Sequence, residues 1–222
     1  MGNIMTTILS YAPLLLKGAL ITCGAWVCAG VISLIVGTVM GIMSCRYLAS
    51  PSSGIIIKCY TFIAKGIPAY VQILIAYFVL PALLGINISG FVAAIGALAF
   101  CSSGYVAEII RSGINTIARG QWDASFVLGY PIKATLFRII LPQAFQNVLP
   151  SLFGEFEQLL KSTSLLATIG ITELTRTGMN IISRELNPIT MYLMIACIYL
   201  LFSAVLQLIS MYIEKRGRYG NR

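Results

Sequence analysis

The stretch Ala19–Met43 reads ALITCGAWVCAGVISLIVGTVMGIM and contains no charged residue. A helix needs about 20 mainly apolar residues to cross the hydrocarbon core of a bilayer, so this stretch is long enough to do so. It is too long for the core of a secretory signal peptide, and no obvious small-residue cleavage site follows it. The stretch therefore predicts a retained transmembrane helix.

The rest of the chain continues this pattern. Hydrophobic residues make up 58% of the 222 residues and charged residues 10%, whereas a soluble domain carries about 25% charged residues. Too little polar side chain remains to cover a compact domain in water. The sequence predicts an all-α integral membrane protein with a single transmembrane domain over residues 1–222 and about five transmembrane helices. The four further spans are about Ile67–Leu84, Phe91–Ile110, Pro142–Leu160 and Pro188–Ile213.

The distribution of Lys and Arg predicts the orientation, because the cytoplasmic connections retain these residues. With the N-terminus outside and the C-terminus in the cytoplasm, only Lys17, Lys161, Arg176 and Arg184 of the 15 basic residues fall elsewhere than inside. Because the basic residues lie between apolar runs and at the C-terminus, they indicate membrane topology and no nucleic-acid partner.

The sequence lacks the residues that several kinds of chemistry require. The chain has no His, its six Cys have no metal-ligand spacing, and no Gly-Lys pair exists from which a phosphate-binding loop could be built. We therefore expect no enzyme activity, no metal site and no cofactor in this chain. Two helical pairs, Glu108 with Arg111 and Glu157 with Lys161, are spaced to form local ion pairs.

Between the third and fourth spans lies a segment that is neither a span nor an ordinary loop. The stretch Gln121–Leu128 predicts a short helix with Asp123 in its first turn, where a carboxylate is favoured. Gly129 is placed to end that helix, and Pro131 to begin a second one. Apolar residues on this second helix predict that it lies at the bilayer surface: Ile132, Leu136, Ile139 and Ile140. Three aromatic residues could lie at that surface or in a groove of another protein: Trp122, Phe126 and Tyr130.

The fourth predicted span carries a polar helical face. A charged group in mid-span costs about 2.5 to 3.5 kcal/mol even on the milder scale, so this face is not expected to contact lipid. It lines either a wet path for a substrate or a hydrogen-bonded contact between helices. Its members recur three or four residues apart: Gln143, Asn147, Ser151, Glu155, Gln158 and Ser162.

The segment before that span resembles a known signature. Asp123-Ala124-Ser125, three residues, Gly129, nine residues, Ile139, one residue and Leu141-Pro142 match the spacing of the EAA motif of bacterial ABC importer permeases. From about residue 60 onward the chain is similar to the polar amino acid subfamily, of the histidine and glutamine type. The stretches that carry this second resemblance are 105–111, 120–122, 141–144 and 161–165. Asp123 and Ser125 differ from the usual Glu and Ala of the motif.

The resemblance implies the architecture of a type I ABC importer permease in a bacterial cytoplasmic membrane. It implies a coupling segment at about 119–141 that docks in a cleft of a cytoplasmic ATPase dimer, with ATP and Mg bound by that ATPase. The residues carried over are Asp123, Ala124, Ser125, Gly129, Leu141 and Pro142. Other implied partners are a second permease subunit, identical or different, and a periplasmic or lipid-anchored amino-acid-binding protein. The external connection 164–187 could contact that protein.

Two other classes compete with this interpretation. A small secondary transporter or channel driven by an ion gradient is expected to show inverted repeats, and five spans do not divide in that way. A membrane enzyme lacks the motifs named above. The preferred hypothesis is an ATP-driven importer of polar amino acids, with the substrate path along Asn147, Ser151, Glu155 and Gln158.

Overall fold

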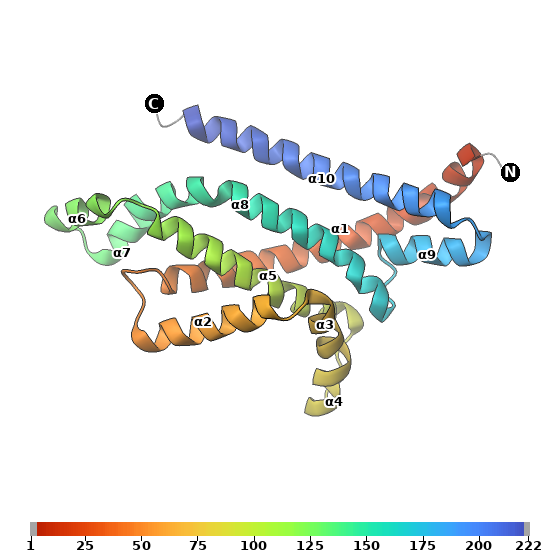
Figure 1. Cartoon of the computed structure of the whole chain (residues 1–222), viewed down its shortest axis with the longest axis horizontal. Helices are drawn as coiled ribbons and strands as arrows, with labels where there is room; N and C mark the ends of the chain where they lie inside the picture. The colour runs from red at the N-terminus through yellow and green to blue at the C-terminus, as the bar shows by residue number, and fades with distance from the viewer. Residues whose placement is uncertain (1–3, 220–222) are drawn as a thin grey trace. The chain divides into compact units, whose positions relative to one another are not determined.

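The computed structural model describes residues 4–219, and these residues form helices and short connections with no β-strand among them (Figure 1). Two helical stretches, η1 (Ile75–Val79) and η2 (Leu136–Ile140), are π-helical, and η3 (Thr163–Ile169) is a 3₁₀-helix. The α-helices are α1 (Ile4–Met43), α2 (Pro51–Gly66), α3 (Ala69–Leu74), α4 (Leu80–Leu84), α5 (Gly90–Asn115), α6 (Arg119–Val127), α7 (Ile132–Thr135), α8 (Leu141–Ser162), α9 (Leu174–Glu185) and α10 (Pro188–Tyr219).

Each predicted span coincides with helix. Three described helices, α1, α5 and α10, are long and apolar enough to cross a membrane, and α2 with α3–α4 makes a fourth candidate if this broken pair counts as one span. Helix α8 occupies the predicted fourth span, but its polar face keeps it out of that set. The all-α membrane class is confirmed, and the number of five spans stays a prediction.

The second predicted span differs from expectation in its details. No span is predicted for the residues between Met43 and Ile67, whereas the structure forms helix α2 there. Pro68 lies just before the first residue of α3. The segment is also not one regular helix, because π-helical η1 separates α3 from α4.

Both π-helical stretches are followed closely by a proline. Pro81 comes two residues after η1 and Pro142 two residues after η2. Proline has no N–H to donate, so the regular backbone ladder cannot continue through it, and the preceding carbonyls need other partners. The prolines thus explain where these two helices depart from regular geometry.

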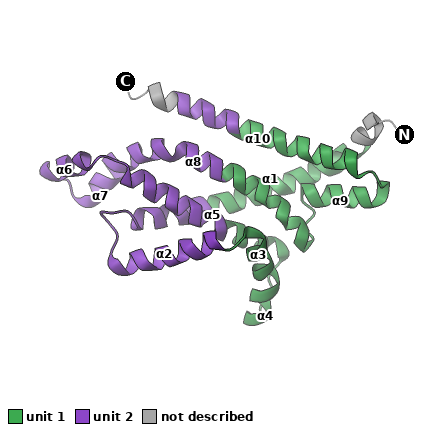
Figure 2. Ribbon diagram, in the orientation of Figure 1, with its two compact units in different colours: residues 1–31, 67–99, 156–206 green, residues 32–66, 100–155, 207–222 purple. Residues whose placement is uncertain are grey.

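The chain divides into two compact units, each described here by itself (Figure 2). Unit 1 comprises residues 1–31, 67–99 and 156–206, and unit 2 comprises residues 32–66, 100–155 and 207–222. The core of unit 1 has two apolar clusters. One contains Ala25, Ala29, Ile73, Ala94, Leu98, Leu159 and Leu166, and the other contains Leu15, Ala19, Leu174, Ile181, Met191 and Ile195.

A buried carboxylate organises the connection after α8 in unit 1. Glu173 is 0% exposed and caps α9, because its carboxylate accepts the backbone N–H groups of Thr175 at 2.9 Å and Arg176 at 2.8 Å. The hydroxyls of Tyr199 at 3.1 Å and Thr22 at 3.4 Å also donate to it. Burial raises the pKa of the Glu173 carboxyl above its ordinary value. No local pattern in the sequence indicates that this carboxylate is buried.

Unit 2 is built on close helix contacts at small residues. A Cβ added at Gly37 would lie 2.6 Å from Val106, and one at Gly41 would lie 2.7 Å from Ile110. The GxxxG pattern of α1 therefore packs against α5 of the same chain, as small residues at helix contacts do. Helix α2 packs on α5 as well, where the hydroxyls of Tyr60 and Ser103 lie 2.6 Å apart.

Candidate functional site

The turn after α6 has the geometry that the sequence predicts. Gly129 has φ of 78°, in the left-handed region that glycine adopts without strain. Its N–H donates to the carbonyl of Phe126 at 3.0 Å, and the N–H of Tyr130 donates to the carbonyl of Ser125 at 3.0 Å. These two bonds form a Schellman motif, which satisfies the last carbonyls of α6 and turns the chain sharply.

One side of α6 packs against other residues of unit 2. The indole of Trp122 is buried and stacks on Tyr47, with ring centroids 4.2 Å apart and an angle of 18° between the planes. Ser125 is also buried, and its hydroxyl donates to the carbonyl of Gln121 at 2.7 Å. The expectation that Trp122 lies at a lipid surface or in a partner's groove is wrong, because its own chain encloses it. The stacking partner is far away in sequence, and no local pattern indicates it.

The other side of α6 and its end are exposed. Val127 is 87% exposed and Leu128 is 74% exposed, and Phe126 and Ala124 are exposed as well. Asp123 is exposed, and one of its carboxylate oxygens lies 3.8 Å from the guanidinium of Arg119. Unit 2 thus anchors α6 through Trp122 and leaves an apolar tip with a neighbouring carboxylate uncovered.

The segment after Gly129 is not a separate helix at a surface. Helix α7 continues through η2 into α8 without a break. Leu136 and Ile140 are buried and Ile139 is partly buried, whereas Ile132 is exposed. The apolar stripe therefore packs mainly inside the chain, which corrects the expectation of an interfacial helix. Leu141 is partly buried and Pro142 is exposed.

The polar face of α8 is largely uncovered. Asn147, Ser151 and Gln158 are exposed, and Glu155 is partly buried and accepts the hydroxyl of Ser102 at 2.7 Å. Because the other side chains of this face have open surroundings, they do not act as hydrogen-bonded contacts between helices of this chain. The polar face can therefore line a wet path or contact a second subunit.

Within unit 2, part of this face lines a cavity of about 420 Å³, named here the α5–α8 cavity. Asn147 and Ser151 line it from α8. Helix α5 contributes Glu108 and Ser112, and Thr116 lines the cavity from the turn just after α5. The cavity thus offers hydroxyl and amide groups that can bind a small polar solute, whereas its one carboxylate, Glu108, is already bound to Lys65 and Arg111.

The predicted ion pairs are present. The guanidinium of Arg111 donates to Glu108 at 3.1 Å, and Lys161 lies 2.7 Å from Glu157. Lys65 from α2 also donates to Glu108, a contact that the sequence interpretation did not include. Within residues 4–219, no cluster of three or more His, Cys, Asp or Glu side chains is placed to hold a metal ion.

Comparisons with known proteins give consistent matches over most of the chain. A model of the family described as the binding-protein-dependent transport system inner membrane component matches residues 33–219. The arginine transport system permease protein ArtQ of Bacillus subtilis (strain 168) is 33% identical over 92% of each chain. The glutamine transport system permease protein GlnP of Escherichia coli (strain K12) is 32% identical over 92% of this chain and 93% of its own.

Solved structures agree with these matches. A structure described as an amino acid ABC transporter with histidines has a TM-score of 0.88 and 31% identity, covering 97% of this chain and 99% of its own. The inward-facing MetNI methionine ABC transporter has a TM-score of 0.79 over 94% of this chain and 98% of its own. Its identity of 16% makes this second likeness one of fold alone.

Proposed function

Because this chain belongs to the family of inner membrane components of binding-protein-dependent transport systems, we propose that it carries polar amino acids through the membrane by coupling to a separate ATPase. The chain is a permease subunit of an ABC importer, and such subunits are generally not catalytic. The relatives named above serve amino-acid transport systems, so a transporter driven by an ion gradient is not favoured. The amino-acid substrate follows from these relatives and from the polar groups of the α5–α8 cavity.

One observation carries the coupling role, namely the exposed apolar tip of α6. Val127 and Leu128 are uncovered apolar side chains at the end of a helix that Trp122 holds to unit 2. An apolar helix end fixed in this way suits a groove on a second protein. We assign Asp123, Ala124, Ser125, Gly129, Leu141 and Pro142 to the coupling segment at about 119–141. Asp123 faces a basic residue of the ATPase, and Ser125 and Gly129 keep the helix and its turn in shape.

The path for the substrate follows the polar face of α8. A zwitterionic amino acid needs acceptors for its ammonium group and donors for its carboxylate. Glu155 and Asn147 supply acceptors, and Asn147, Ser151 and Gln158 supply donors. Because a single chain of this size does not enclose a path, a second permease subunit, identical or different, completes it.

The remaining partners and the orientation follow from the same proposal. The N-terminus lies outside and the C-terminus in the cytoplasm, so α6 faces the cytosol and α9 faces the outside. ATP and Mg are bound by the cytoplasmic ATPase dimer, since the chain contains no Gly-Lys pair for a phosphate-binding loop. A periplasmic or lipid-anchored binding protein delivers the substrate on the other side.

Uptake into proteoliposomes tests the proposal. The complex is reconstituted with its binding protein, and uptake of radiolabelled arginine and glutamine is measured with ATP, without ATP and without the ATPase subunit. We expect uptake only with ATP and ATPase together. Uptake that an ion gradient drives in the absence of the ATPase would contradict the proposal and favour a secondary transporter.

Glu155→Gln tests the path separately. The amide keeps the size of the side chain and removes its negative charge, so the ammonium group of the substrate loses a charged partner. We expect uptake to fall about tenfold while complex assembly is unchanged. Glu157→Gln is the control, since Glu157 is bound to Lys161 and lies off the polar face. Equal uptake by the two variants would contradict the path.

A further inference from the structure

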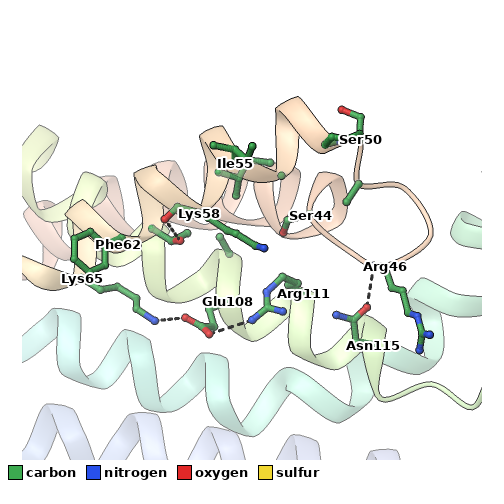
Figure 3. A pocket seen from close by; sticks show the side chains of 16 residues that line it. Ser44, Arg46, Ser50, Ile55, Lys58, Phe62, Lys65, Glu108, Arg111 and Asn115 are labelled. Carbon is green, nitrogen blue, oxygen red and sulfur yellow. Dashed lines mark hydrogen bonds and ion pairs between the residues drawn. The ribbon is translucent and has the colours of Figure 1, made fainter.

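A second cavity in unit 2, named here the α2 cavity, has a volume of about 780 Å³ and is not part of the proposed substrate path. It is lined by α2, by the last turns of α5 and by the residues that follow α1 (Figure 3). Ser44 and Arg46 come just after α1 ends, and Arg111 and Asn115 belong to the last turns of α5. Because α1 and α5 are candidate spans, the cavity lies at the level where their apolar lengths end.

The charge in this cavity is strongly unbalanced. Four basic residues line it, namely Arg46, Lys58, Lys65 and Arg111, against one carboxylate, Glu108. Lys65 and Arg111 both bind that carboxylate. Within the described part of the chain, no carboxylate lies within ion-pair distance of the side chains of Lys58 or Arg46. Figure 3 shows Lys58 reaching from α2 toward α5. The cavity therefore carries an excess of three positive charges and favours an anion.

The same face of α2 alternates cations with apolar side chains. Ile55, Lys58, Phe62 and Lys65 all line the cavity and are spaced three or four residues apart, so they share one helical face. Ile55 is 63% exposed and Phe62 is 78% exposed. An anion alone leaves these two side chains uncovered, whereas a molecule with a charged head and an apolar tail contacts both parts.

We propose that the α2 cavity binds the phosphate head group of an anionic phospholipid, with its acyl chains along Ile55 and Phe62. Basic pockets between membrane helices at the cytoplasmic side suit such head groups. A zwitterionic amino acid fits poorly, because its ammonium group needs a carboxylate and both oxygens of Glu108 are already bound to cations. A free phosphate makes no use of the apolar face. The ligand of this site is therefore a lipid, which the surrounding bilayer supplies.

Lipid binding to the purified complex, with the full-length chain, tests this proposal. Native mass spectrometry measures the binding of dioleoyl phosphatidylglycerol and of dioleoyl phosphatidylcholine, which share acyl chains and differ in net charge. The test variant combines Arg46→Gln with Lys58→Gln. The matched control combines Arg184→Gln with Lys215→Gln, which removes the same charge from exposed positions outside both the cavity and the coupling segment.

We expect wild-type complex to prefer phosphatidylglycerol. Each cation removed from the cavity weakens that binding about fivefold, so the test variant binds about 25-fold more weakly. The control pair is expected to bind phosphatidylglycerol within about twofold of wild type, and Lys58→Arg is expected to retain binding because it keeps the charge. The removed side chains are exposed, so thermal unfolding in detergent is expected to be unchanged and separates loss of the site from loss of the fold.

Four outcomes would overturn the proposal. They are equal binding of the two lipids, unchanged phosphatidylglycerol binding in the test variant, equal weakening in the control pair, and displacement of the lipid by arginine, glutamine or glycerol 3-phosphate at similar concentrations. The last outcome would identify the cavity as a site for a soluble solute. None of these results depends on transport activity, so the proposal fails or stands separately from the proposed function.

Discussion

Two connections between predicted spans differ in which of their side chains they bury. The connection that contains α6 leaves Val127 and Leu128 uncovered, although both are apolar. The connection that contains η3 and α9 buries Leu166, Leu174 and even the carboxylate of Glu173. Exposed apolar side chains at a fixed helix end indicate a surface that a partner covers. A buried carboxylate with all its hydrogen bonds inside the chain indicates an element that supports its own unit.

The contrast also separates two roles for charge. Glu173 accepts two backbone N–H groups and two hydroxyls and so fixes the start of α9. Asp123 has an exposed contact with Arg119 at 3.8 Å and no other ion pair within the described part of the chain. A change at the first residue is therefore expected to affect stability, and a change at the second is expected to affect coupling.

Glu173→Ala is expected to give the largest effect. The change removes the cap of α9, worth about 1 kcal/mol, and leaves buried donors without an acceptor, at about 1 to 3 kcal/mol for each group. We expect a loss of about 3 kcal/mol or more in the free energy of unfolding, measured by denaturant titration in detergent. Glu157→Ala is the control and is expected to cost about 0.5 kcal/mol. An equal loss of unfolding free energy in the two variants would show that Glu173 supports its unit no more than an ordinary ion pair does.

Gly129→Asp is expected to act on coupling. A residue with a Cβ in the left-handed region costs about 1 to 2 kcal/mol, and a Cβ at this position has no neighbouring atom within 4 Å. The helix end therefore changes its path while the fold remains. We expect ATP-dependent uptake to fall at least tenfold while ATP hydrolysis and complex recovery persist. Gly120→Asp, on α6 and equally unobstructed but without a positive φ, serves as the control. Wild-type uptake by the Gly129 variant would count against the coupling segment.

Asp123→Asn is expected to have the smallest effect on stability. Its ion pair with Arg119 is exposed, so the free energy of unfolding should change by less than about 0.5 kcal/mol. Uptake is expected to fall about threefold, because the proposed contact of the carboxylate with a basic residue of the ATPase is lost. Arg119→Gln breaks the same pair and keeps the carboxylate, so it should leave uptake near wild type. If both variants reduce uptake equally, uptake depends on the ion pair between Asp123 and Arg119 and not on the carboxylate alone.

Local patterns predicted much of the fold and part of the site. Long apolar runs located the helices of the predicted spans, and the position of Gly129 predicted the left-handed turn after α6. The same approach did not find α2, because Lys58 and a serine-rich start interrupt its apolar run. Nor did it find the stack of Trp122 on Tyr47, since that contact joins residues far apart in sequence. Burial of Glu173 was missed for the same reason, because its hydroxyl donors belong to α1 and α10.

Cross-linking from two matched positions tests the central claim most directly. Val127 is 87% exposed in the α6 connection and Leu186 is 84% exposed after α9, so the same photoreactive residue fits either place. We predict that a probe at position 127 forms an adduct with the cytoplasmic ATPase and that a probe at position 186 does not. Adducts of the position-127 probe with lipid alone, or ATPase adducts from both positions, would contradict the account.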